Sequence, residues 1–372
     1  MPKILVFDKG GRKERKELIN KKKAPRDFLQ GIDYLKLNGF DIEYFSSSEK
    51  YEKSIIFFLG RILEQFFSKI TNIGIRPLSV FRIRKKINKS DYVVSFTDGF
   101  SLSLGFYYSF FEPKSRIKLA GAFHKLSDFD TKLPFFLRSL YLRIFSKILR
   151  RLDYIIFFGG ADRLNSSRIF NLKDEKTFLI KFGVDTSFWV PKESSSFSSN
   201  YLFSIGQDPA RDFETLLKVK TNKKIHIHTC LLAPINNEQF KITNGSYRDT
   251  KNGLTDIEVR KLYQDAFSII IPLKNVFQPS GYSVTLQALA CGKPVILTLT
   301  KGLWAPTSFK NLENCILVKP SSESEIQNAI NLLENNEELY RTISTNARET
   351  AKKHFSLYKS NESTLGIFKN FV

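Results

Sequence analysis

The sequence contains few cysteines and no long apolar run. Its three cysteines, Cys230, Cys291 and Cys315, are scattered and lack the spacing of a metal site or of a disulfide framework. We therefore interpret them as core thiols of a protein in a reducing compartment. The most apolar stretches, residues 54–59 and 154–158, are far shorter than the roughly 20 residues of a membrane-spanning helix.

A secretory leader pattern is also missing. The chain starts with a short strand pattern at residues 3–8, without the basic, apolar and small-residue zones of a signal peptide. The sequence therefore predicts a cytoplasmic protein without a spanning segment.

Acidic residues are scarce relative to basic ones. Across 372 residues, 58 Lys and Arg stand against 37 Asp and Glu, so the net charge is +21, and most of the excess lies within residues 1–190. Such a surface predicts an anionic partner, which can be nucleic acid, an anionic lipid surface or a phosphorylated substrate. The 42% of hydrophobic residues suffices for a substantial core, and the length suits two domains.

Two stretches of the N-terminal half combine apolar and basic side chains. In residues 134–152, apolar residues recur at helical spacing, and the remaining face is basic (Arg143, Lys147, Arg150 and Arg151). Residues 60–89 repeat this combination around Phe66, Phe67 and Phe81. The pattern fits a helix at an anionic membrane surface, and it also fits an ordinary surface helix packed on its own domain.

Strand and helix patterns alternate along the chain. Residues 3–8 predict a strand followed by the glycine loop Gly10-Gly11, and residues 27–38 predict a helix that Gly39 closes before a second strand. The alternation continues to residue 182 and restarts at residue 201. It predicts an α/β fold with two parallel, doubly wound sheets.

The serine-rich segment 192–200 separates the two halves. We expect an N-terminal domain at residues 1–190 and a C-terminal domain at residues 191–355. The final segment, residues 356–372, is predicted to cross back to the N-terminal domain.

The most informative segment follows a strand that ends at Pro272. Ser280-Gly281 is predicted to open a helix there, and the N–H groups at a helix N-terminus bind phosphate. We therefore predict a diphosphate site formed by this loop and the first helical turn, with Gln287 far enough along the helix to reach a ribose hydroxyl (Gln278, Ser280, Gly281, Tyr282, Ser283, Val284 and Gln287). The alternative is that Ser280-Gly281 is only a helix cap.

This segment, Gln278-Pro-Ser-Gly-Tyr-Ser-Val-Thr-Leu-Gln-Ala-Leu-Ala-Cys-Gly-Lys-Pro-Val-Ile296, resembles the donor-binding motif of GT-B glycosyltransferases, in particular the retaining family 4 (glycosyl transferases group 1). Segments 183–191, 204–217 and 313–320 are similar to further family motifs and occur in family order. The resemblance covers nearly the whole chain. It implies two Rossmann-like domains that face each other across a cleft, with a nucleotide-diphosphate sugar bound to the C-terminal domain.

The resemblance also implies roles for single residues. Arg211 would clamp the diphosphate as it leaves, and Gln207 stands where the family usually has an arginine, so a second cation would come from Lys274 or Lys301. His124, after the strand at residues 117–123, would orient the sugar. Gly10 and Gly11 would let the backbone approach the donor or the acceptor. The alternatives are a surface ion pair for Arg211, a structural role for His124, and a tight turn at the two glycines.

The segment departs from the family at its carboxylates. The family usually has glutamates at both ends of the motif, whereas Gln287 replaces the second and Gln278 or Pro279 stands near the first. A glutamine still hydrogen-bonds a ribose, but it brings no negative charge near the transferred sugar. The identity of the donor is therefore open.

The resemblance implies a hexosyltransferase of cell-envelope polysaccharide or glycolipid synthesis. It would transfer the sugar to a saccharide or lipid-linked acceptor with retention, peripherally on the inner face of the membrane. No cofactor is expected besides the donor, and no metal, because Asp128 and Asp130 follow His124 in a loop and not at a strand end.

Two other functions remain open. The first is a GT-B protein that binds a nucleotide-sugar without transferring it, since the glutamates are missing. The second is a nucleic-acid-binding protein, because aromatic residues such as Phe106, Tyr107 and Tyr108 stand between basic segments. No recognised nucleic-acid-binding module supports the second.

Overall fold

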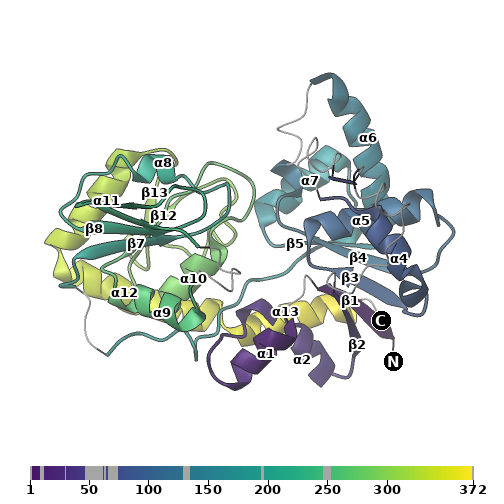
Figure 1. The fold of residues 1–372 in the computed structure, drawn as a ribbon, viewed down its shortest axis with the longest axis horizontal. Helices are drawn as coiled ribbons and strands as arrows, with labels where there is room; N and C mark the ends of the chain where they lie inside the picture. The colour runs from purple at the N-terminus through teal and green to yellow at the C-terminus, as the bar shows by residue number, and fades with distance from the viewer. Residues whose placement is uncertain are drawn as a thin grey trace.

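The computed structural model describes residues 2–8, 12–29, 31–46, 62, 64–65, 74–128, 135–193, 197–245 and 253–370. Within them, the chain forms two β-sheets that lie side by side, each with helices on both faces (Figure 1). The predicted α/β class with two doubly wound sheets is confirmed.

In the described residues, the N-terminal sheet has six parallel strands in the order β2-β1-β3-β4-β5-β6. They are β1 (Lys3–Asp8), β2 (Asp41–Ser46), β3 (Tyr92–Ser95), β4 (Lys118–Phe123), β5 (Tyr154–Phe157) and β6 (Thr177–Leu179). Ile4 and Val6 of β1 join one hydrophobic cluster, whereas Leu5 and Phe7 join another. Both faces of the strand are therefore covered, as in parallel sheets generally.

The helices around this sheet are α1 (Arg12–Asn20), α2 (Ile32–Leu37), α4 (Pro77–Ile87), α5 (Asp98–Phe110), α6 (Phe135–Arg151) and α7 (Gly160–Phe170). Short 3-10 turns occur at η1 (Asp27–Leu29), η2 (Leu126–Asp128) and η4 (Asp174–Lys176). Helices α5 and α7 begin directly after β3 and β5, and η2 follows β4, so all three start at the same edge of the sheet.

The C-terminal sheet has the order β13-β12-β11-β7-β8-β10-β9 in the described part of the chain, and only β9 runs antiparallel to its neighbour. Its strands are β7 (Tyr201–Ile205), β8 (Lys224–His228), β9 (Ile235–Asn236), β10 (Phe240–Thr243), β11 (Ile269–Ile271), β12 (Val295–Thr298) and β13 (Ile316–Val318). Its helices are α8 (Phe213–Leu216), α9 (Asp256–Asp265), α10 (Tyr282–Ala290), α11 (Glu323–Asn335) and α12 (Glu337–His354).

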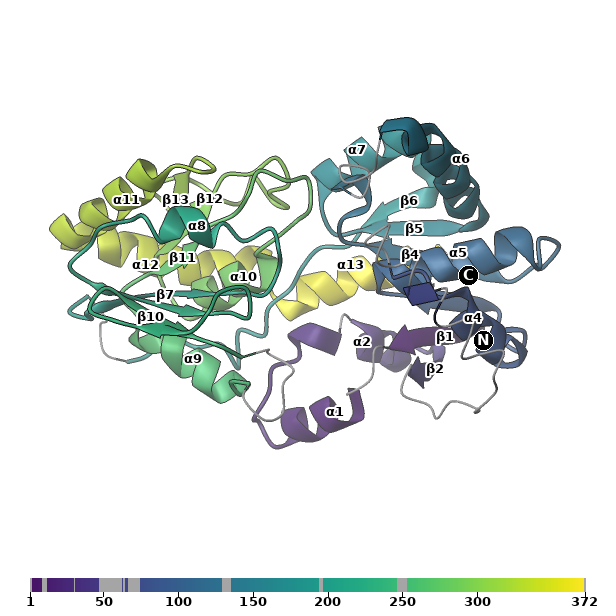
Figure 2. The same ribbon diagram turned by 45° about the horizontal axis from the view of Figure 1, so that its top comes forward.

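The chain passes between the sheets twice, and the two crossings touch. Val184 pairs with Ser356 in an isolated parallel bridge, and its N–H donates to the carbonyl of Phe355. After the second crossing, α13 (Leu357–Lys369) lies against α2 of the N-terminal half (Figure 2). The domain boundary at residue 190 stays a prediction.

Some local predictions were wrong. Residues 27–38 form η1 and α2 where one helix was predicted, and helix α1 precedes them where no helix was predicted. Gly31 separates η1 from α2, because its φ of 73° is left-handed and interrupts a right-handed helix. The predicted core position also fails for Cys230, which is exposed, whereas Cys291 and Cys315 are buried, and all three are free thiols.

No helix of the described residues is both long enough and apolar enough to pass through a membrane.

Candidate active site between the two sheets

The loop after β11 leads into the N-terminus of α10, as the sequence predicted. Gly281 caps the helix with a φ of 77°, and a Cβ at this position would lie 2.9 Å from Cγ2 of Ile271. Both the conformation and the space therefore require glycine. The N–H groups of the first helical turn have no preceding carbonyl within the helix, so this end of α10 can bind an anion.

Arg211 is buried beside this helix end, with only 5% of its surface exposed. Its guanidinium lies against the backbone of Gly206, and a Cβ on Gly281 would be 3.5 Å from Nη1. Nε and Nη1 are buried without a hydrogen-bond partner, and burial lowers the pKa of the guanidinium. The alternative of a surface ion pair is therefore wrong, and the arrangement suits an anion that would complete the hydrogen bonding of Arg211.

Hydrogen bonds fix the backbone of the loop between β7 and α8, which carries Arg211, against the loop between β11 and α10. Arg211 forms an isolated antiparallel bridge with Leu273, and the N–H of Lys274 donates to the carbonyl of Ala210 at 2.8 Å. Asp212 caps α8 by accepting from the N–H and hydroxyl of Thr215. These contacts hold the guanidinium and the α10 N-terminus at fixed relative positions.

The carboxylate of Asp208, in the same loop as Arg211, bonds two side chains of the loop between β11 and α10. Oδ2 of Asp208 accepts from Nε2 of Gln278 at 2.5 Å and from Oγ of Ser280 at 2.8 Å. Oδ1 accepts from the N–H of Ala210 at 3.0 Å. Gln278 and Ser280, both predicted as donor ligands, thus bond Asp208 in this structure.

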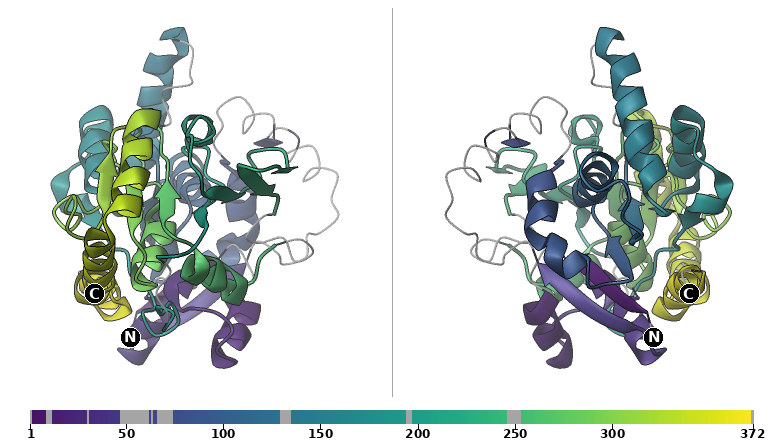
Figure 3. Two further views of the ribbon diagram at one scale, coloured as in Figure 1. Left: turned by 90° about the vertical axis from the view of Figure 1, so that its left-hand side faces the viewer. Right: turned by 90° about the vertical axis from the view of Figure 1, so that its right-hand side faces the viewer.

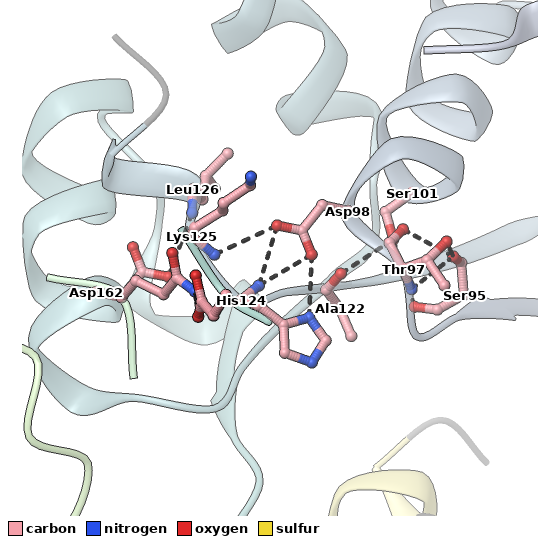
Figure 4. A network of polar contacts seen from close by, with 11 residues as sticks. Ser95, Thr97, Asp98, Ser101, Ala122, His124, Lys125, Leu126 and Asp162 are labelled. Carbon is pink, nitrogen blue, oxygen red and sulfur yellow. Dashed lines mark hydrogen bonds and ion pairs between the residues drawn. The ribbon is translucent and has the colours of Figure 1, made fainter. Parts of the chain in front are cut away.

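His124 follows β4 and bonds to Asp98 at the start of α5 (Figure 4). Its Nδ1 lies 3.0 Å from Oδ1 of Asp98, whose carboxylate also accepts from the N–H groups of His124 and Lys125. Burial raises the pKa of the Asp98 carboxyl, but the hydrogen bonds and charge of His124 lower it by more. Because the ionised carboxylate only accepts, Nδ1 carries the proton and Nε2 is left to bind another group.

A fully buried carboxylate, that of Asp162 of α7, holds the turn after His124. It accepts from the N–H of Leu126 at 3.3 Å and of Ser127 at 2.8 Å (both in η2). Burial raises the pKa of Asp162 to about 6. The last residue of η2, Asp128, reaches the other domain, where its carboxylate accepts from the N–H of Phe277 and of Gln278.

Aromatic rings connect the two domains at the same place. His124 stacks on Phe158 with 4.3 Å between ring centroids, and Phe158 stacks on Phe182 at 5.2 Å. Phe182 in turn stacks on Tyr282 of α10. The structure therefore brings His124 and the α10 N-terminus into one continuous region.

The other predicted residues make contacts of their own. Gln287 is buried, accepts from the hydroxyl of Tyr263 at 3.2 Å and donates to Asp27 at 3.5 Å. Gln207 donates to the carbonyl of Gly245. Lys274 is exposed, whereas Nζ of Lys301 lies 5.6 Å from the ring centroid of Phe277. Ser283 and Val284 are half-buried in the first turns of α10. Their roles as ligands stay predictions.

Gly10, Gly11 and Asp130 lie outside the described residues. Within the described residues, no group of three or more His, Cys, Asp or Glu has the arrangement of a metal site.

Sequence reasoning missed Asp98, Asp162 and Asp208. Asp98 and Asp162 carried a usable signal, since each stands in the first turn of a helix that follows a strand, at the edge where ligands bind. Asp208 carried no such signal, and its partners Gln278 and Ser280 are distant in the sequence.

Comparisons with known proteins agree with this geometry. Residues 252–350 match the model of the family described as glycosyl transferases group 1. Residues 252–350 are therefore similar to glycosyl transferases group 1. The matched segment includes α9, α10 and the loop of Gln278, and it confirms the predicted glycosyltransferase. A search of curated proteins found no match.

Solved structures of glycosyltransferases share the fold of the whole chain. Anabaena Alr3699/HepE, solved in complex with UDP and glucose, is 16% identical, with a TM-score of 0.66 over 99% of this chain and 100% of its own. Sucrose-phosphate synthase (tll1590) from Thermosynechococcus elongatus is 14% identical, with a TM-score of 0.68 over 100% and 99%. A glycosyltransferase from Rickettsia africae ESF-5 is 14% identical, with a TM-score of 0.61 over 99% and 98%. The chain therefore has the GT-B fold, as predicted.

Proposed function

We propose that this glycosyltransferase transfers a sugar from a nucleotide-diphosphate sugar to a saccharide or lipid-linked acceptor. The buried guanidinium of Arg211 carries the proposal, because Nε and Nη1 lack partners beside the N-terminus of α10. Buried guanidinium nitrogens without acceptors are unfavourable, and a diphosphate supplies acceptor oxygens together with negative charge. Alr3699/HepE, which shares the fold, was solved with UDP-glucose.

The proposed reaction replaces one bond of the anomeric carbon with another. The bond from this carbon to the phosphate oxygen breaks, and the acceptor oxygen forms the new bond on the same face. Because the new bond forms on the face from which the diphosphate departs, the configuration is retained. The acceptor proton passes to the leaving diphosphate, and the step uses no metal. Arg211 and the α10 N-terminus stabilise the charge that develops on the leaving group.

His124 would act on the sugar from the N-terminal domain. With Nδ1 donating to Asp98, Nε2 of the neutral imidazole can accept a hydrogen bond from a sugar hydroxyl. The ring is held on both sides, by the Asp98 bond and by the stack on Phe158. Such fixed orientation lowers the entropy cost of aligning the sugar.

A donor panel tests the proposal. The purified protein is mixed with UDP-, GDP-, ADP- and CMP-sugars, and thermal stabilisation and nucleotide release are followed together. Transfer predicts stabilisation and acceptor-dependent release with one donor, and R211A should reduce kcat/KM by about 100-fold or more. The matched control is R341A, which removes an exposed arginine on α12 that pairs with Glu337. Thermal stabilisation by a donor without nucleotide release in the presence of any acceptor would favour a protein that only binds the donor. No response to any donor would refute the proposal.

We also propose that the N-terminal domain contacts an anionic membrane surface, which suits a lipid-linked acceptor. Helix α6 extends beyond the rest of the molecule (Figure 3). From Tyr141 onward its apolar side chains belong to the N-terminal core, while Arg143, Lys147 and Arg150 are exposed. The contact would therefore be mainly electrostatic. The exposed rings of Phe110 and Phe111, at the end of α5 next to Lys147, would add an apolar contact.

Vesicle sedimentation tests this contact. The protein should pellet with anionic vesicles at low salt and be released as ionic strength rises. Replacing Arg143, Lys147 and Arg150 by Gln should abolish pelleting, since each basic residue contributes about 1 kcal/mol near such a surface. The control replaces the exposed Lys218, Lys220 and Lys241 of the C-terminal domain by Gln, which is the same change in charge. Equal loss in both triple variants, or no pelleting of the wild type, would contradict a specific contact.

A further inference from the structure

Gln278 is held by two carboxylates, one from each domain. Its backbone N–H donates to Oδ2 of Asp128 at 2.7 Å, and its side-chain Nε2 donates to Oδ2 of Asp208 at 2.5 Å. Asp128 ends the turn η2 that follows His124, and Asp208 lies three residues before Arg211. One residue therefore connects the His124 side of the site to the Arg211 side.

Each aspartate also bonds a second residue of the segment 277–280. Asp128 also accepts from the N–H of Phe277 at 3.3 Å, and Asp208 also accepts from the hydroxyl of Ser280 at 2.8 Å. Between them, Pro279 packs on Gly159 so closely that a Cβ on this glycine would be 3.1 Å from Cβ of the proline. The turn at residues 277–280 is thus fixed from both domains.

This turn sets the position of the α10 N-terminus. It is followed directly by Gly281, whose left-handed φ places the first helical turn next to the guanidinium of Arg211. Hydrogen bonds from N–H groups to an ionised carboxylate are charge-assisted and stronger than neutral ones. The bonds of Asp128 exist only while the two domains are in this arrangement, because Asp128 and Gln278 belong to different domains.

We propose that Asp128 and Asp208 are positioning residues that act through the turn at 277–280. Together they hold this turn in the position at which the N-terminus of α10 and Arg211 bind the donor diphosphate. The inference rests on the proposed function, since it requires that α10 and Arg211 bind a nucleoside diphosphate. In this role Gln278 and Ser280 orient the site and do not contact the donor with their side chains.

Calorimetric titration of the full chain with UDP, ADP, GDP and CDP tests the inference. For the nucleotide that binds the wild type, D128A and D208A should each raise Kd by about tenfold, which corresponds to one lost charge-assisted bond. Because both residues fix the same turn, the double variant D128A/D208A should bind only slightly more weakly than either single variant. D128N keeps one acceptor oxygen and should recover part of the affinity.

The control is R15A, which removes a different contact between the domains. Arg15 of α1 bonds Asp256 of α9 at 2.5 Å and 3.2 Å. Its loss should leave Kd within about twofold, and thermal melts of all variants establish that they are folded.

If R15A weakens binding as much as D128A, or if the effects of D128A and D208A multiply, the specific positioning role is refuted. If the wild type binds and both single variants bind equally well, the inference fails while the proposed function stands. If the wild type binds none of the four nucleotides, both are refuted.

Discussion

The ring of Tyr282 stacks on that of Phe182 with 3.5 Å between centroids and 10° between planes. Tyr282 is the first residue of α10, whereas Phe182 follows β6 in the N-terminal half. Since Phe182 also stacks on Phe158, and Phe158 on His124, the two sides of the site meet through ring faces. The contacts in this stack are between ring faces, so their contribution should depend little on salt.

Replacing Tyr282 by alanine should loosen this contact. Tyr282 is half-buried, so we expect Y282A to lower the free energy of unfolding by about 1–2 kcal/mol. Urea denaturation measures this change. Y282F keeps the ring and is the control, and Y282A with wild-type stability at both low and high salt would contradict the importance of the stack.

Asp98 should matter for activity through His124. D98N removes the charge that keeps Nδ1 protonated, so we expect transfer to fall about 10- to 100-fold. H124A should cost a similar factor, and the double variant should cost little more, because Asp98 acts through the imidazole. Steady-state kinetics with the donor identified by the panel measures these effects. Multiplying losses would show that Asp98 acts independently.

Stability should depend on pH through Asp27. Its carboxyl accepts from Nε1 of Trp189 at 2.7 Å and lies beside Asp185, and burial raises its pKa from 3.8 to about 7. The folded state therefore binds the proton more tightly than the unfolded state. This contribution to stability is present below about pH 4 and is lost as pH rises to about 7, by up to about 4 kcal/mol.

The variant D27N isolates this effect. It loses hydrogen bonds at every pH but lacks the titration, so its deficit relative to the wild type should shrink between pH 5 and pH 8. Urea denaturation of both proteins across this range gives the difference. A deficit that stays constant with pH would show that Asp27 does not titrate in this window.

Two glycines provide a matched test of backbone strain. G281A places a side chain at a left-handed φ and against Ile271, so it should destabilise the protein by about 1–2 kcal/mol. G366A lies in α13 with no atom within 4 Å of the added Cβ and should stabilise it by roughly 0.4–1 kcal/mol. Thermal melts compare the two, and equal effects would contradict the requirement for glycine at the α10 cap.

The sequence predicted those features of the fold that depend on local period and local turns. The alternation of strands and helices identified both sheets, and Ser280-Gly281 identified the start of α10 within two residues. The edge strand β9 was not predicted, because its two residues are too few to show an alternation of apolar and polar side chains.

The polar contacts of the site could not be predicted in the same way. Asp128 and Gln278 are 150 residues apart in sequence, and nothing in either neighbourhood identifies the other as its partner. Gln287 shows the same limit, because its bond to Asp27 depends on how the two domains meet. Residue type and spacing thus located the site, but its internal hydrogen bonds required the tertiary structure.

The last helix has a consequence for the order in which the protein is made. Phe368 of α13 is fully buried, Tyr34 of α2 bonds Glu362, and the ring of Phe40 meets that of Phe368 edge to face. A ribosome completes these residues only after the whole C-terminal sheet has been synthesised. During synthesis, the apolar surface of α2 therefore stays uncovered until α13 has been made. A chain truncated before residue 357 would expose this surface permanently.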